Sequence, residues 1–108
     1  MLSGFRIMWL MVLFDLPVVT KPERKAATGF RTGLLDLGFE MAQYSVYVRF
    51  CASQSSASTQ VSRVQGMLPK SGKVTILTFT DKQFERAISF HGRSSIPQKT
   101  APEQLEIF

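Results

Sequence analysis

The stretch that determines the fold is residues 7–17, which read IMWLMVLFDLP. Its first eight residues are all apolar, and an unbroken apolar run of this length is typical of a central β-strand covered on both faces. Eight residues are too few to span a bilayer, and Asp15 follows where a signal peptide would carry small residues, so no membrane segment is expected. Pro17 lacks the N–H that a strand ladder needs. The sequence therefore predicts a buried strand over residues 6–14.

A helix is expected directly after this strand, over residues 21–37. Thr20 and Glu23 have the spacing of a capping box, in which each side chain accepts a hydrogen bond from the backbone N–H of the other residue. Gly38 suits the left-handed position that ends many helices. Apolar residues recur at helical spacing and predict the face that packs on the sheet: Ala27, Phe30, Leu34 and Leu37.

The following residues alternate between strand and helix patterns. Residues 39–51 are rich in β-branched and aromatic side chains and form either one long strand or two. Residues 55–67 predict a second amphipathic helix, and residues 73–80 predict another strand, followed by a short helical turn capped by Asp81. The order β-α-β-β-α-β predicts an α+β fold, a ferredoxin-like sandwich, with residues 1–92 as its domain.

The remaining residues, 93–108, are predicted to lie outside that domain. Residues 92–102 are polar, contain two prolines and are expected to form a linker. Residues 103–108 are expected to form an extra C-terminal strand that pairs with a second copy of the chain, because an unpaired sheet edge readily accepts another strand. The residues predicted at this homodimer contact are Leu105, Ile107 and Phe108.

Composition narrows the chemistry that the chain can perform. Its 108 residues suffice for one domain, and 13 Lys and Arg against 8 Asp and Glu leave a net charge of +5, which suits a polyanionic partner. The only cysteine, Cys51, and the only histidine, His91, cannot form a disulfide within the chain or a Cys/His zinc site. One cysteine is also consistent with the reducing cytoplasm. The candidate chemistry is therefore that of carboxylates, hydroxyls or a bound metal ion.

Asp15 is the most informative residue because it directly follows the buried run. It is either a turn residue that caps the next loop or a ligand of a divalent cation, since Mg²⁺ prefers one or two carboxylates together with water and phosphate. The chain has three Asp and five Glu, and they form no local cluster. One chain is therefore not expected to build a carboxylate-rich site, whereas two copies of Asp15 facing each other across a two-fold axis could do so.

Basic residues recur along one face of the predicted helix 21–37. The face is either simply solvated or follows the phosphates of a nucleic acid, which arginine binds through a forked pair of hydrogen bonds. The residues predicted to contact nucleic acid are Lys21, Arg24, Lys25 and Arg31, with Thr28 among them.

Other motifs point to no further activity. The Gly66…Gly72-Lys73 segment is not a P-loop, because five residues separate the glycines where four are required and a strand is predicted to follow. His91 is predicted to be a surface or packing residue rather than a general base. Three aromatic residues are predicted to belong to the core rather than to a base-stacking platform: Tyr44, Tyr47 and Phe50.

Several short motifs, in this order, resemble one known family. They are Leu13-Phe-Asp15-Leu-Pro17, Glu23-Arg24-Lys25, Gly38-Phe39 with Gln43-Tyr-Ser-Val-Tyr47, Val74-Thr-Ile-Leu-Thr-Phe-Thr-Asp81 and His91-Gly92. Over roughly residues 6–92 the chain resembles the small CRISPR-associated nuclease of the spacer-adaptation module, in the branch that accompanies type II systems.

The resemblance implies a ferredoxin-like homodimer in which Asp15 of each protomer is the catalytic, metal-binding residue. Mg²⁺ or Mn²⁺ would assist the attack of water on a phosphodiester of RNA or DNA. Arg24 matches a position associated with nucleic-acid handling, whereas Pro22 and Met41 stand where some members carry basic residues. The implied partners are the CRISPR integrase and the prespacer DNA duplex.

The resemblance thus leaves two alternative functions. The first is a metal-dependent endonuclease that acts on RNA or DNA during spacer acquisition. The second is a non-catalytic DNA-binding bridge in the integrase complex that retains Asp15. A small-ligand regulatory domain on the same fold is a third, more distant alternative, and the sequence shows no sign of an effector pocket.

Overall fold

The computed structural model describes residues 7–98, which form a four-stranded antiparallel sheet, two long helices, one short helix and a small hairpin. The sheet order is β2-β3-β1-β4, so the first strand is central, as its apolar run predicts. Its strands are β1 (Met8–Asp15), β2 (Glu40–Gln43), β3 (Val46–Cys51) and β4 (Lys73–Thr80). This order with antiparallel pairing is the ferredoxin-like sandwich predicted from the sequence.

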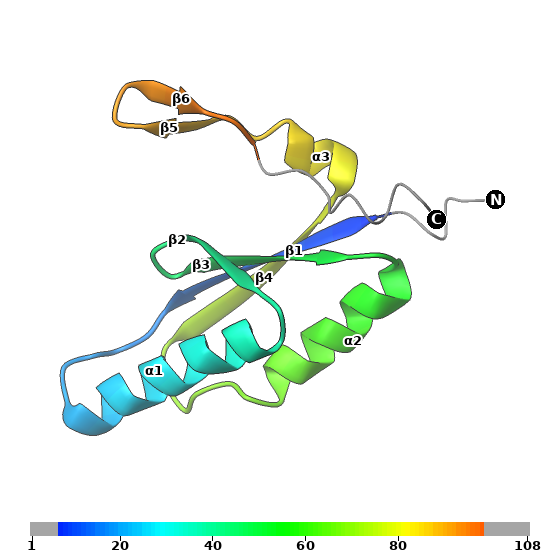
Figure 1. Ribbon diagram of the computed structural model, residues 1–108. Coiled ribbons are helices and arrows are strands. Elements are labelled where there is room, and N and C mark those ends of the chain that lie inside the picture. The colour runs from blue at the N-terminus through cyan, green and yellow to red at the C-terminus, as the bar shows by residue number, and fades with distance from the viewer. Residues whose placement is uncertain (1–6, 99–108) are drawn as a thin grey trace.

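The helices α1 (Lys21–Asp36) and α2 (Gln54–Gln65) lie on one side of the sheet (Figure 1). The predicted capping box opens α1: the Thr20 hydroxyl accepts from the Glu23 N–H at 3.2 Å, and the Glu23 carboxylate accepts from the Thr20 N–H at 2.8 Å. Gly38 has a φ of 90°, so it adopts the predicted left-handed conformation just beyond α1.

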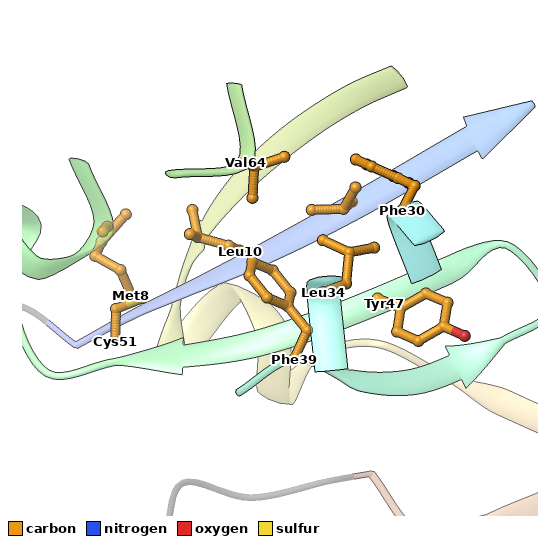
Figure 2. Packing of buried hydrophobic residues seen from close by; sticks show 10 residues of the cluster. Met8, Leu10, Phe30, Leu34, Phe39, Tyr47, Cys51 and Val64 are labelled. Atoms are coloured by element: carbon orange, nitrogen blue, oxygen red, sulfur yellow. The ribbon is translucent and has the colours of Figure 1, made fainter. Parts of the chain in front are cut away.

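The main core lies between these helices and β1. Leu10 and Val12 of β1, Leu34 of α1 and Val64 of α2 are fully buried there, with Tyr47 of β3 beside them (Figure 2). Because successive side chains of a strand point to opposite faces, the other side chains of β1 lie on the face that the long helices do not cover.

A second, smaller cluster occupies part of that opposite face. Trp9 stacks on Phe84 of α3 (Asp81–Glu85) with ring centroids 4.3 Å apart, and its Nε1 donates to the Asp81 carboxylate at 2.7 Å. The expectation that Asp81 caps this helix is therefore wrong: Thr80 is the N-cap, and its hydroxyl accepts from the Gln83 N–H. Asp81 pairs with the buried indole instead, because a buried N–H needs an acceptor.

Residues 89–96, partly predicted to be linker, form a hairpin of β5 (Ser89–His91) and β6 (Ser94–Ile96). A two-residue connection joins these strands, and Gly92 within it has a φ of 64°, as tight hairpin turns require. The linker prediction is thus wrong for residues 94–96. The predicted dimer strand at residues 103–108 lies outside the described residues.

Residues 39–51, left open between one strand and two, form two. Ser45, between β2 and β3, has a φ of 63°, which lets the chain reverse direction there.

Within the described part of the chain, no helix is both long enough and apolar enough to cross a membrane.

Candidate functional site

Asp15 lies at the last position of β1 and is exposed. By the alternation of the strand it shares a face with Met11 and Leu13, away from the long helices. Its register partner on β4 is Lys73, and directly opposed residues of an antiparallel pair carry their side chains on the same face. The structure thus places a cation next to the candidate metal ligand, which the sequence reasoning missed.

The backbone at Asp15 is held in place by its neighbours. Gly72 has a φ of 97°, and a Cβ at that position would lie 2.7 Å from the Asp15 carbonyl oxygen. On the other side, the N–H of Phe14 donates to the Ser45 carbonyl oxygen at 3.1 Å. The end of β1 is therefore fixed between the start of β4 and the turn that joins β2 to β3.

A hollow of about 680 Å³ opens beside this strand end, between α1 and the β2–β3 turn. Of its lining residues Asp15 is the acidic one, and α1 contributes Arg24, Thr28 and Arg31. The predicted basic face is therefore divided: its two arginines line the hollow, whereas Lys21 and Lys25 are exposed and do not line it.

The two arginines differ in their local contacts. Nη1 of Arg24 donates to the carbonyl oxygens of Val19 at 2.7 Å and of Val18 at 3.3 Å, which ties the β1–α1 connection to the helix. Arg31 lies two turns further along α1 and lines the same hollow. Arg24 thus shapes the hollow as well as adding charge to it.

The part of the chain that the structure describes holds no ready-made cluster of metal ligands. Across residues 7–98, no three His, Cys, Asp or Glu side chains are grouped closely enough to hold an ion. Divalent cations such as Mg²⁺ accept a site with one or two carboxylates when water and phosphate complete the shell. Asp15 supplies one such carboxylate, and a second copy of the chain facing it across a two-fold axis could supply another.

The other predicted residues are placed as follows. His91 is exposed on β5, in agreement with the surface alternative, and the Gly72-Lys73 pair opens a strand, which confirms the rejection of a P-loop. Tyr47 is buried and Phe50 packs against Trp9, as predicted for core residues. The same prediction is wrong for Tyr44, which is 92 % exposed because it lies in the turn and not in a strand.

The fold and this site define a class of small ferredoxin-like proteins that carry one carboxylate at the end of the central strand, next to a basic helix. The chain belongs to the family of CRISPR associated protein Cas2, whose sequence model matches residues 8–87. This confirms the family indicated by the sequence motifs.

Two curated relatives align with this chain over all or nearly all of its length. The chain is 61 % identical over 108 residues to the "CRISPR-associated endoribonuclease Cas2" of Paracidovorax avenae, covering all of both proteins. It is 43 % identical over 107 residues to the protein of the same name from Flavobacterium psychrophilum, covering 99 % of this chain and 93 % of that protein. A solved structure titled "Crystal structure of cas2" matches with a TM-score of 0.55 and 18 % identity, covering 90 % of this chain and 95 % of the other, and supports the fold.

Proposed function

We propose that this chain is a metal-dependent endonuclease that acts in the cytoplasm with the CRISPR integrase during spacer acquisition. The observation that carries the proposal is the position of Asp15, at the fixed end of a central strand and in the same hollow as two arginines. The names of the relatives, which call them endoribonucleases, point to the same class of reaction.

The proposed active form is a homodimer in which the two Asp15 carboxylates lie close together. Asp15 shares the uncovered sheet face with Met11, Leu13 and Leu77, and Leu77 is 40 % exposed. Pairing two such faces would bury apolar surface and bring the ends of the two central strands together. The second carboxylate that a single chain lacks would then come from the partner.

Each group in the site has a proposed part in phosphodiester cleavage. The Asp15 carboxylates would hold Mg²⁺ or Mn²⁺, which when bound activates water and neutralises developing charge. Arg24 and Arg31 would bind substrate phosphates through forked hydrogen bonds and hold the chain in the hollow. Lys73, next to Asp15 in the register, would offset repulsion between the two carboxylates when no cation is bound.

The test is the variant Asp15→Asn, which keeps the size of the side chain and removes its charge. We expect cleavage to fall by at least about a hundredfold, since even the loss of an outer partner of a metal site costs roughly 10–100-fold. The assay uses single- and double-stranded RNA and DNA with Mg²⁺ or Mn²⁺. In thermal unfolding, Mg²⁺ should raise the Tm of the wild type but not that of the variant.

Asp36→Asn is the matched control, because Asp36 is an exposed aspartate at the far end of α1 and does not line the hollow. It should cut at the wild-type rate. Cleavage by Asp15→Asn at the wild-type rate would remove Asp15 from catalysis.

The second candidate function is a non-catalytic bridge that binds the prespacer DNA duplex within the integrase complex. The exposed basic face of α1 favours it, because phosphate contacts alone would be enough. This function is supported if neither wild type nor Asp15→Asn cuts any substrate while both bind duplex DNA and assemble with the integrase.

A further inference from the structure

Tyr44 is a large aromatic side chain that the fold leaves almost entirely in solvent. It is 92 % exposed, whereas Tyr47 three residues later is 1 % exposed. Its backbone is nonetheless well constrained. It stands in the short turn between β2 and β3, next to Ser45, whose φ is 63° and whose carbonyl oxygen accepts from the Phe14 N–H. Tyr44 is therefore held at a set position relative to the end of β1.

That position is the edge of the hollow that contains the candidate site. Tyr44 lines it together with Asp15, Arg24 and Arg31. A volume of about 680 Å³ lies within the range of roughly 300–1,000 Å³ found for small-molecule sites, so it can hold one nucleotide. The hollow thus offers an aromatic face for a base and guanidinium groups for phosphates, beside the end of β1 where Asp15 stands.

We propose that Tyr44 stacks on the base of an unpaired nucleotide whose phosphates are held by Arg24 and Arg31. The inference rests on the proposed function and deepens it by naming the residue that positions a base at the site. A base within a duplex is already stacked on both sides, and freeing it costs a few kcal/mol. An unpaired base has a free face on which an aromatic side chain can stack. Stacking does not read base edges, so Tyr44 confers a preference for single strands with little sequence preference.

The experiment compares the affinity of the full chain for a 20-nucleotide single strand and for the blunt duplex of the same sequence, in chelator so that no cleavage occurs. Tyr44→Ala should weaken single-strand binding about tenfold, the usual cost of losing one aromatic stack. Tyr44→Phe keeps the ring and should stay within about twofold of wild type. Duplex affinity should change by less than about twofold in both variants.

Ile88→Ala is the control for trimming an exposed apolar side chain, because Ile88 is 79 % exposed and does not line the hollow. It should bind both nucleic acids as the wild type does. A second measurement needs no variant: single strands with one abasic site at each position in turn should show a position where the missing base weakens binding to wild type about tenfold.

The outcomes separate this inference from the proposed function. If the chain binds neither nucleic acid, the stacking role and the proposed function are both refuted. A second outcome is that the chain binds both nucleic acids, but Tyr44→Ala binds single strands like the wild type and no abasic position weakens binding. That result would refute the stacking role and leave the proposed function unaffected. An equal loss in Tyr44→Ala and Tyr44→Phe would assign the effect to the hydroxyl and overturn stacking.

Discussion

At the scale of single residues, the two arginines of the hollow are not equivalent. Arg24 is bound to the carbonyl oxygens of Val18 and Val19, so it stabilises the connection between β1 and α1. Arg31 lines the hollow on an exposed part of α1. Both carry the charge that a phosphate would bind, but only for Arg24 does the structure show a structural role that truncation would remove.

We therefore predict different results for Arg31→Ala and Arg24→Ala. Each should lower the magnitude of the slope of log K against log salt by about 0.9 for duplex DNA and by about 0.7 for a single strand, the values expected for one lost phosphate contact. Arg24→Ala should also lower the free energy of unfolding by about 0.5–1.5 kcal/mol, as its hydrogen bonds are lost, while Arg31→Ala should leave it unchanged. Binding measured over a salt series and urea unfolding test both statements. An unchanged salt slope in both variants would mean that the basic face is only solvated.

At the scale of elements, α1 carries glycines whose surroundings differ. Gly29 is exposed in the middle of the helix, and a Cβ there would meet nothing within 4 Å. A Cβ on Gly33 would lie 2.5 Å from Sδ of Met67, so this glycine allows the segment after α2 to approach. Gly29 thus weakens the helix without any packing role, whereas Gly33 has one.

Gly29→Ala should accordingly stabilise the fold by about 1 kcal/mol, the difference in helix propensity between the two residues. For a domain of this size that raises Tm by about 4–8 °C. Gly72→Ala is the contrasting variant: its φ of 97° and the contact with the Asp15 carbonyl oxygen should make it lower Tm. Thermal unfolding at one protomer concentration measures both. A lower Tm for Gly29→Ala would contradict the propensity argument.

At the scale of the whole molecule, the two faces of the sheet are covered unequally. The long helices α1 and α2 lie over one face, while α3 covers only part of the other (Figure 1). A hollow of about 690 Å³ lies on this second face, lined by Met11, Leu13 and the β5–β6 hairpin among others. A partner protomer on this face would complete its burial and bring in the second carboxylate.

The prediction is a dimer at micromolar concentration in analytical ultracentrifugation. Leu77→Glu puts a charge on the uncovered face and should weaken the dimer at least about tenfold. Leu35→Glu is the matched control, since Leu35 is 45 % exposed on α1 and Leu77 is 40 % exposed on β4. Truncation after Pro102 should weaken the dimer too, if residues 103–108 pair with the partner. A wild-type chain that sediments as a monomer would refute the dimer.

The sequence by itself determined the order of the main elements, but not the β5–β6 hairpin or the division of residues 39–51 into two strands. The unbroken apolar run predicted the central strand, the Thr20–Glu23 pair the start of α1, and Gly38 its end. These features were predictable because strand alternation, helix periodicity and capping depend on residues within a few positions of one another. The same local information singled out Asp15 as the residue at the end of the central strand.

Only the tertiary structure decided what surrounds that residue. The register of β4 against β1 places Lys73 opposite Asp15. The indole N–H of Trp9 donates its hydrogen bond to Asp81, which is 72 positions away in the sequence. Tyr44 is exposed, although the sequence predicts it to belong to the core, because the chain reverses at Ser45. Register and burial depend on how distant segments pack together, and a shift of one residue would reverse which side chains face the core. No pattern within a single segment contains that information.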